Sequence, residues 1–394
     1  MNDIATASAH AAEQLVRAVL RSGGIDWPGD DAPADQPRGP GPTARDLLAA
    51  AAHHGVTLLL YARLKPTASW QTWPEALRRA LEQQAQTATT RDLLRTRELV
   101  ATLATLTAAG ITPLVMKGAA LAHSLYPAPA LRTRQDTDLL VRRDQAAPTA
   151  RLLEARGYRS AQRLDALAHF NHQIEYHQRD GYDIRHTIDL HWRISNTELF
   201  ALAWTQTELA QRAVPVPALG PAVRALGFAD ALLLACAHRA HHAYEPAGEG
   251  EDRYAGDRLI WLYDIHLLAQ AMTTTDWECF TRLASAKRLQ RICLDSFTLT
   301  RQALGTNFPG PVMAALTRTA HRAIPLEALQ GNELQRLLAT LRATRSWARR
   351  LGLIASYLFP PPAYILAKYD TQRRWQLPLL YVRRIAEGLR KPPG

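Results

Sequence analysis

Apolar residues recur every three to four positions over most of this chain, which is the spacing of amphipathic α-helices. Residues 1–22, 44–64 and 74–109 follow this pattern. Between the first two segments, residues 23–42 are dense in Gly, Pro and Asp, and we expect a loop there. The N-terminal part of the chain, residues 1–109, is therefore predicted to be a helical region.

The pattern changes at Gly110, a residue type that commonly follows the end of a helix. Beyond it, apolar runs with the alternation typical of strands separate short helical stretches. We predict a strand over 111–116, a helix over 118–125, a strand over 136–141, a helix over 144–156 and a hairpin over 169–194 that turns at Asp180-Gly181. These elements would form one small mixed β-sheet, and residues 110–197 are assigned to this α/β core.

Helical periodicity resumes after Thr197, so residues 198–394 are predicted to form a helical C-terminal domain. Clusters of Pro, Gly and acidic residues interrupt it at 215–221, 245–256, 306–311 and 359–362. We therefore expect an α+β fold, in which a small mixed sheet lies within predominantly helical N- and C-terminal regions. The length of 394 residues is sufficient for two or three domains.

Three carboxylates lie on the predicted strands of the core. Asp136 and Asp138 are two residues apart, so their side chains point to one face of a strand, with Cα atoms about 7 Å apart. Asp189 lies in an apolar, β-rich run on the second arm of the hairpin. Carboxylates on neighbouring strands can hold the pair of divalent metal ions that assists in-line phosphoryl or nucleotidyl transfer. Metal-dependent nucleotidyl transfer is therefore the first hypothesis.

The sequence also resembles a known family, the uncharacterised bacterial nucleotidyltransferases related to the DNA polymerase β superfamily. The resemblance extends over most of the chain. The residues that carry it are the run Lys117-Gly118-Ala119-Ala120-Leu121, Tyr126-Pro127, Arg132, the pair Asp136 and Asp138, Gly157-Tyr158, Asp189-Leu190-His191-Trp192, His238, Trp261, Tyr263, Asp264 and Phe359-Pro360.

The resemblance implies a function for several of these residues. Asp136, Asp138 and Asp189 would be the catalytic carboxylates and would bind Mg²⁺ or Mn²⁺. The helix start would hold the nucleotide phosphates, through the Lys117 ammonium and the backbone N–H groups of Gly118, Ala119 and the residue that follows. A helix N-terminus suits this role because its first N–H groups have no partner within the helix.

Four further side chains lie near the carboxylates, and two of them, both arginines, have two interpretations. Arg132 and Arg134 are predicted to bind the nucleotide, and the alternative is that they pair with the carboxylates and hold the loop. His191 and Trp192 follow Asp189 on its strand. We expect His191 to be a packed histidine or a support for the carboxylates rather than a base, and Trp192 to pack in the core.

Composition excludes several classes of protein. A content of 47% hydrophobic and 21% charged residues is that of an ordinary globular chain, not of a disordered or fibrous one. The three cysteines, Cys236, Cys279 and Cys293, form no Cys-x-x-Cys motif, so neither a disulfide framework nor a cysteine zinc site is indicated. We expect no export signal, no membrane span and a cytoplasmic location.

The chain has a net charge of +11, and its densest basic segment is C-terminal. Residues 349–394 contain nine Lys and Arg against Asp370 and Glu387. Five Tyr and Trp residues are interleaved with them. This segment is expected either to be a solvated basic face on helices packed through their aromatic residues, or to contact RNA, an acidic protein or a membrane surface.

A second group of chemically active residues lies in the C-terminal region. His238 and His242 are four residues apart on a predicted helix, beside His241, and Asp264 follows on the next helix. Zinc or iron binding, a core hydrogen bond between His238 and Asp264, and a groove that holds the acceptor are the three interpretations. The hydrogen bond has the largest weight.

These observations predict an enzyme that moves a nucleoside monophosphate from an NTP, such as ATP, to a hydroxyl group and releases pyrophosphate. The acceptor is a small molecule, a protein or RNA. One alternative is a catalytically degenerate nucleotidyltransferase fold that binds nucleotide or RNA as a regulatory module. The other is a protein that chiefly binds RNA or peptides through its basic helical tail.

Overall fold

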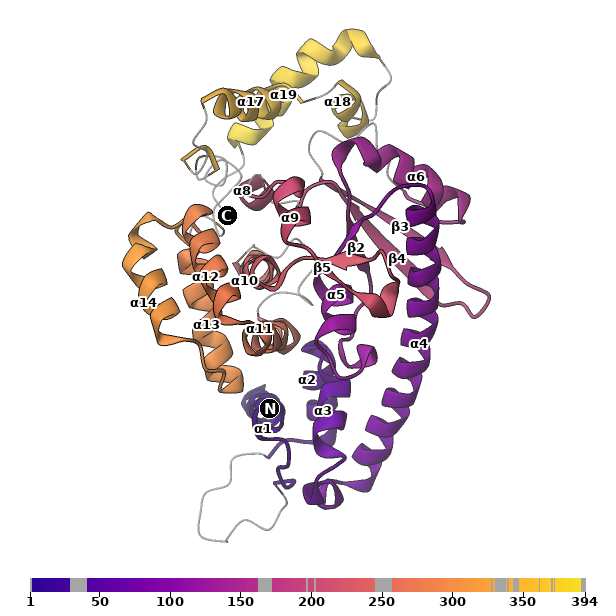
Figure 1. Cartoon of the computed structure of the whole chain (residues 1–394), viewed down its shortest axis with the longest axis vertical. Helices are drawn as coiled ribbons and strands as arrows, with labels where there is room; N and C mark the ends of the chain where they lie inside the picture. Colours follow the sequence, from indigo (N-terminus) through magenta and orange to yellow (C-terminus); the bar gives the residue numbers. More distant parts are fainter. Residues whose placement is uncertain are drawn as a thin grey trace.

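The protein has an α+β architecture, as predicted, with a six-stranded mixed sheet flanked by helices (Figure 1). The computed structural model describes residues 2–28, 41–161, 172–195, 198–201, 203–244, 257–326, 329, 338, 340–342, 347–360, 362–369, 371 and 373–390.

The sheet has the strand order β3-β4-β2-β1-β6-β5. At its centre β2 is antiparallel to β1 and parallel to β4, and β3 and β4 form the antiparallel hairpin. At the other edge β6 is parallel to β1 and antiparallel to β5. The strands are β1 (Leu114–Met116), β2 (Thr137–Leu140), β3 (Gln173–Arg179), β4 (Arg185–His191), β5 (Val214–Pro215) and β6 (Arg224–Ala225).

The N-terminal region is helical, as the periodicity predicts. The longest helix, α4, runs along one side of the molecule and packs on α6 next to the sheet (Figure 1). Gly110, just after α4, has a φ of 75°, the left-handed conformation expected of a glycine at a helix end. The helices up to the hairpin are α1 (Asn2–Ser22), α2 (Ala44–His53), α3 (Thr57–Leu64), α4 (Glu75–Ala108), α5 (Lys117–Ser124) and α6 (Ala146–Ala155).

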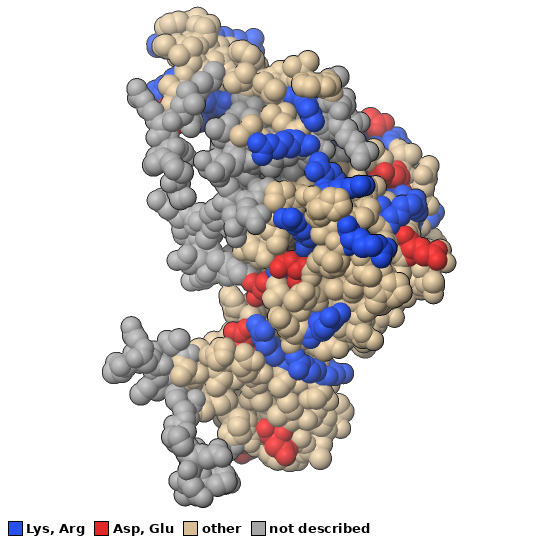
Figure 2. All heavy atoms as spheres, turned by 90° about the vertical axis from the view of Figure 1, so that its left-hand side faces the viewer, with Lys and Arg blue, Asp and Glu red and all other residues tan. Residues whose placement is uncertain are grey.

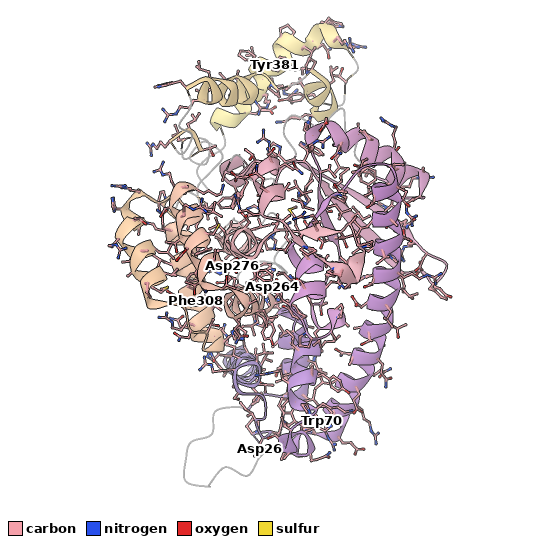
Figure 3. The ribbon with its side chains drawn as sticks, viewed as in Figure 1. Asp26, Trp70, Asp264, Asp276, Phe308 and Tyr381 are labelled. Atoms are coloured by element: carbon pink, nitrogen blue, oxygen red, sulfur yellow. The ribbon has the colours of Figure 1, made fainter. Side chains whose placement is uncertain are left out.

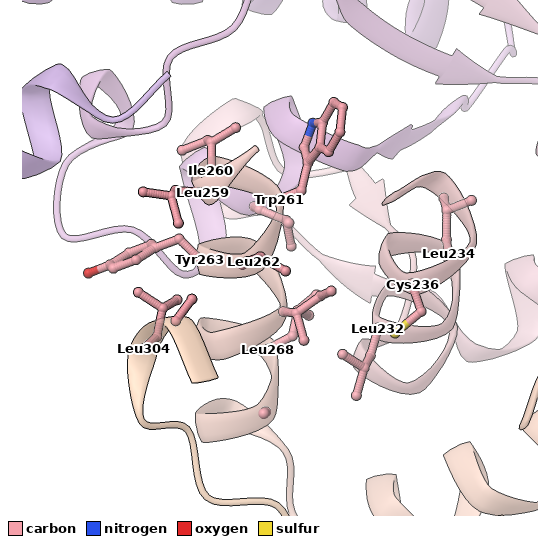
Figure 4. Packing of buried hydrophobic residues seen from close by; sticks show 14 of the residues in the cluster. Leu232, Leu234, Cys236, Leu259, Ile260, Trp261, Leu262, Tyr263, Leu268 and Leu304 are labelled. Atoms are coloured by element: carbon pink, nitrogen blue, oxygen red, sulfur yellow. The ribbon is translucent and has the colours of Figure 1, made fainter. Parts of the chain in front are cut away.

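The C-terminal region is also mainly helical. Its helices pack through a large apolar core that includes leucines of α10, α11 and α13 (Figure 4). The same core contains Leu15 of α1, Met116 of β1 and Leu121 of α5, so it joins all three predicted regions. The helices are α8 (Glu198–Ala201), α9 (Gln206–Arg212), α10 (Phe228–Tyr244), α11 (Leu259–Ala271), α12 (Thr274–Ala286), α13 (Gln290–Leu304), α14 (Gly310–Thr319), α17 (Trp347–Leu358), α18 (Pro362–Lys368) and α19 (Leu377–Arg390).

A second apolar core lies between the sheet and helices α4 and α6. It includes Leu103 of α4, Leu139 of β2, Leu153 of α6 and Leu190 of β4. Trp192 belongs to this core, as predicted. Because alternate residues of β2 and β4 are buried here, the intervening Asp138 and Asp189 lie on the opposite face.

The prediction that everything after Thr197 is helical is wrong at one point. The predicted break at 215–221 separates two short strands, β5 and β6, which extend the sheet beyond β1. Each has two residues, too few for an alternating pattern to be recognised. The predicted break at 245–256, most of the loop at 23–42 and the start of the predicted hairpin lie outside the described residues. The division into three domains stays a prediction.

Within the described ranges, no single helix is long and apolar enough to cross a bilayer. Helices α2 and α3 satisfy the length and composition requirement only as a pair, bent by 119°. Their residues Leu47, Leu59 and Leu60 are buried in the apolar core.

Candidate functional site

Strand register places two of the predicted carboxylates side by side. On β2 and β4, which run parallel, Asp138 is directly opposite Asp189, and on β1 Met116 is opposite Asp138. The sequence therefore predicted correctly that Asp138 and Asp189 come from neighbouring strands. Only the pairing of residues far apart in the chain brings them to the same level of the sheet.

His191 joins these carboxylates because it lies two residues after Asp189 and so points to the same face. Its Nε2 is 2.9 Å from Asp138 Oδ1, and its side chain is fully buried. One ligand atom each from Asp138, Asp189 and His191 lie within 4.8 Å of one another. We call these three residues together with Lys117 the Asp138 cluster.

Lys117 reaches the cluster from the junction between β1 and α5. Its φ of 50° lies in the left-handed region, which is uncommon for a residue with a side chain. The Nζ atom donates a hydrogen bond to Asp138 Oδ1 at 2.6 Å. An unusual backbone conformation at a charged residue is typical of a functional site.

The charges of the cluster shift the pKa values of its members in different directions. Burial raises the pKa of Asp189 to about 7, with help from the negative charges of Asp138 and Asp136. Burial acts in the same sense on Asp138, but Lys117 and His191 outweigh it and the pKa of Asp138 is lowered. The pKa of His191 is lowered by burial, which favours the neutral imidazole.

The cluster fits a divalent metal ion. Two carboxylates and a neutral imidazole are ligands suited to such ions. Asp189 Oδ2 accepts a hydrogen bond from Gln173 at 3.3 Å, whereas Asp189 Oδ1 is buried and has no hydrogen-bond partner among the described residues. A buried carboxylate oxygen without a donor is energetically costly, and a cation would satisfy it.

Asp136 lies near this group but outside it. The residue as a whole is exposed just before β2, and its carboxylate is not among the ligand atoms within 4.8 Å of one another. Desolvation and the charge of Asp138 nevertheless raise the pKa of Asp136. Metal binding by Asp136 stays a prediction.

Arg132 pairs with a carboxylate other than those predicted. Its guanidinium group donates to Asp264 through Nε and a terminal nitrogen, at 2.8 Å each, and Tyr126 Oη donates to the same carboxylate at 2.7 Å. All three residues are buried, and we call them the Asp264 cluster. Asp264 of α11 lies near the middle of the molecule (Figure 3).

Gly118 is close to the Asp264 cluster. A Cβ atom at this position would be 3.2 Å from the central carbon of the Arg132 guanidinium group. The glycine therefore provides space for Arg132. In addition, α5 begins with no side-chain hydrogen bond at its N-cap, Met116, so the first N–H groups of the helix are not capped by it.

Arg134 also has a partner outside the predicted carboxylates. One of its terminal nitrogens is 2.6 Å from Asp92 of α4, and the side chain is almost completely buried. The alternative interpretation placed Arg132 and Arg134 on the predicted carboxylates. Instead, Arg132 pairs with Asp264 and Arg134 pairs with Asp92. Both pairs nevertheless fix the loop that leads into β2.

The expected hydrogen bond between His238 and Asp264 is wrong. Asp264 accepts from Tyr126 and Arg132, while the His238 ring lies 4.5 Å from the ring of His242 and 5.5 Å from that of Trp261. Burial and the nearby Lys117 ammonium lower the pKa of His238. In the described part of the chain, these histidines do not form a cluster of metal-ligand atoms.

A small cavity connects the two clusters with the histidine helix. It has a volume of about 40 Å³, which is space for a few water molecules. Its lining includes Lys117, Ser124, Phe228, His238 and Asp264. The third interpretation of the histidine region, a groove that holds the acceptor beside the nucleotide site, stays a prediction.

Sequence reasoning gave His191 a packing or supporting role and did not consider it as a ligand. The spacing Asp189-x-His191 on a strand was the available signal, because alternate residues share a face. Asp92 gave no comparable signal, since it lies on a long helix more than 40 residues before its arginine partner.

The chain belongs to a family described as uncharacterised nucleotidyltransferases, whose sequence model matches residues 40–305. The match includes the strands of the sheet and every residue of the two clusters. It ends before α14 and the basic C-terminal helices. No curated protein matches the chain.

Proposed function

We propose that this protein transfers a nucleoside monophosphate from an NTP to a hydroxyl group and releases pyrophosphate. The observation that carries the proposal is the juxtaposition of Asp138, Asp189 and His191, with the Lys117 ammonium 2.6 Å from Asp138. Membership in the nucleotidyltransferase family supports the same reaction.

Asp138, Asp189 and His191 would hold a divalent ion, Mg²⁺ or Mn²⁺. Such an ion polarises the phosphoryl oxygens and stabilises negative charge as the bond to the leaving group breaks. The carboxylate ligands suit Mg²⁺ and Mn²⁺ alike. Asp136, at the exposed edge of the cluster, would complete the site from the solvent side.

The remaining steps belong to side chains and backbone groups of the chain. The acceptor oxygen forms a bond to the α-phosphorus, the bond from that phosphorus to the bridging oxygen breaks, and pyrophosphate leaves. Asp189 takes the proton of the acceptor hydroxyl. Lys117 and the N–H groups of Gly118 and Ala119 bind the phosphates.

Arg132 and Arg134 have a more restricted role in this proposal. Their guanidinium groups are engaged by Asp264 and Asp92. We therefore assign them to positioning the loop before β2. To contact the nucleotide directly, each guanidinium group would have to bind the nucleotide and its carboxylate partner at the same time.

The test is transfer of label from each α-labelled NTP to cell extract, with Mg²⁺ or Mn²⁺, by the wild type and by Asp138→Asn. Asp144→Asn is the matched control, because Asp144 is an exposed aspartate just after β2. Transfer by the wild type and the control but not by Asp138→Asn is expected. The labelled product would also identify the class of acceptor.

Other results would separate the alternatives. Nucleotide binding without transfer to any extract would support the degenerate, regulatory form of the fold, in which Asp136→Asn leaves the biological effect intact. If no NTP binds in the presence of either ion, the catalytic proposal is wrong.

A further inference from the structure

Exposed apolar side chains are concentrated in the C-terminal helices. Among the described residues, eleven large hydrophobic side chains are exposed, and eight of them lie between residues 347 and 382. We call α17, α18 and α19 the C-terminal helical unit, which lies at one end of the molecule (Figure 1). A soluble surface rarely carries so many apolar side chains in one short segment.

On α17 the exposed residues form a stripe. Trp347, Leu351, Ile354 and Leu358 are spaced by four, three and four positions, so they share one face of the helix. Trp347 is 73% exposed and Leu351 is 63% exposed. This face is directed to solvent instead of the core.

The second stripe begins before α19 and continues along it. Trp375, Leu379 and Val382 repeat the spacing of four and three residues. They are 73%, 69% and 65% exposed, respectively. Two separate helical segments of the unit thus present tryptophan and aliphatic side chains to solvent.

The unit also has an inner side that is packed. Ile365 of α18 and Leu380 of α19 are buried, and the ring of Tyr381 lies 6.1 Å from that of Phe359. Tyr381 Oη donates to the backbone carbonyl of Pro360. Tyr381 is labelled within this unit in Figure 3. The aromatic packing expected from the sequence therefore applies to the tyrosine, and the exposed tryptophans form a different surface.

Positive charge surrounds the stripes. Residues 349–394 contain nine Lys and Arg against two acidic residues, a net charge of +7. One of the two acids, Glu387, is engaged by Arg383 at 2.8 Å and by Tyr369 at 2.9 Å. Arg373 and Arg374 precede α19 and are exposed. Blue side chains are also frequent on the upper half of the face in Figure 2.

We propose that the C-terminal helical unit binds the surface of an anionic lipid bilayer. A helix in the interfacial region presents Trp and aliphatic residues on one face, with Lys or Arg nearby. The apolar stripes of α17 and α19 fit this description, with Arg350 on α17 and Arg383 and Arg384 on α19. Tryptophan prefers the level of the lipid headgroups. The family match ends before this unit, so the proposal is independent of the nucleotidyl-transfer proposal.

Nucleic acid fits the surface less well. Single strands bind to aromatic side chains on which bases stack. Five of the seven residues in the two stripes are aliphatic, and they offer no ring for stacking. The positive charge serves either partner, but the aliphatic side chains are explained by a bilayer.

The experiment is co-sedimentation of the full chain with two kinds of vesicle. One kind contains phosphatidylcholine alone, and the other also contains about 30% phosphatidylglycerol, which makes its surface negative. Leu351→Asp/Leu379→Asp is the test variant. Leu93→Asp is the matched control, because Leu93 is 65% exposed on α4, far along the chain from the unit. The wild type and the control should bind the anionic vesicles, and the test variant should bind at least about tenfold more weakly.

A second variant keeps the result interpretable if the aspartates disturb folding. Trp347→Phe/Trp375→Phe retains an aromatic ring at each position and should still bind, while quenching of Trp fluorescence by brominated lipid falls strongly. Absence of wild-type binding to anionic vesicles would overturn the proposal. So would equal binding by all variants, salt-sensitive binding of RNA that depends on the stripes, or concentration-dependent dimerisation that buries them.

Discussion

Two buried charge clusters lie close together in this protein, and their hydrogen bonding differs. In the Asp264 cluster, one carboxylate accepts from Tyr126 and from two nitrogens of Arg132. In the Asp138 cluster, Lys117 Nζ and His191 Nε2 both contact Asp138 Oδ1, while Asp189 Oδ1 is left without a hydrogen-bond donor among the described residues. The first arrangement is complete by itself, whereas the second has an unsatisfied oxygen that a cation would complete.

This difference separates a structural cluster from a candidate catalytic one. Both combine buried cations with carboxylates, so burial and charge alone do not distinguish them. A fully paired cluster loses stability when a partner is removed. A cluster of like charges with an unsatisfied oxygen is itself costly, and its removal affects function more than folding.

The largest effect is expected for Asp189→Asn. Activity should fall at least about 1000-fold, because the site loses a metal ligand and the group that accepts the proton. The metal-free protein should become more stable by about 1 kcal/mol, since a half-buried carboxylate beside two other carboxylates is replaced by a neutral amide. Label transfer and urea unfolding measure the two quantities. If Asp189→Asn lost stability as well as activity, the contrast between the two clusters would be contradicted.

The opposite pattern is expected for Asp264→Asn. Arg132 would be left buried without its carboxylate, at a cost of about 3 kcal/mol in the free energy of unfolding. Arg132→Met/Asp264→Leu should recover most of this loss because both charges are removed. Asp26→Asn is the control, as Asp26 is exposed. Urea unfolding measures the stability of both variants. If Asp264→Asn is as stable as the control, the Asp264 cluster has no structural role.

A smaller effect is expected for Lys117→Met. Loss of the ammonium should weaken NTP binding by about tenfold, as a charge-assisted contact to phosphate is removed. Lys65→Met is the control, because Lys65 pairs with Glu82 on the surface of the N-terminal region. Isothermal titration with a non-hydrolysable NTP analogue gives both affinities. Unchanged affinity of Lys117→Met would remove Lys117 from the phosphate site.

The smallest effect concerns the stability of the protein at acidic pH. Burial, with a contribution from Arg134, lowers the pKa of His123 to about 4. Its folded-state pKa is below the unfolded value of about 6.5, so its stabilising effect is complete above pH 6.5 and is lost as pH falls toward 4. Because the ring is partly exposed, we expect at most about 1 kcal/mol.

His123→Gln should therefore flatten the dependence of the melting temperature on pH between 6.5 and 4. His10→Gln, on an exposed histidine of α1, should leave it unchanged. A wild-type profile that the two variants alter equally would assign the acid sensitivity to other groups.

Much of the fold followed from local sequence. Long amphipathic segments predicted the helices, and Asp180-Gly181 predicted the hairpin between β3 and β4. The strands β5 and β6 were missed because a strand of two residues depends on its neighbours in space rather than on its own sequence pattern. The pairing of Arg132 with Asp264 was also missed, since a buried ion pair between residues 132 positions apart leaves no local pattern.

The sequence by itself determined the chemistry that this protein has available: Asp138 and Asp189 on strands, Lys117 at the start of a helix, and an excess of arginine at the C-terminus. Alternation along a strand is a local property, so it can be read from neighbouring residues. Only the tertiary structure decided which groups meet. Register aligned Asp138 with Asp189 and brought His191 to them, and packing directed Arg132 to Asp264 while it left Trp347 and Trp375 in solvent, because pairing and burial depend on contacts between distant parts of the chain.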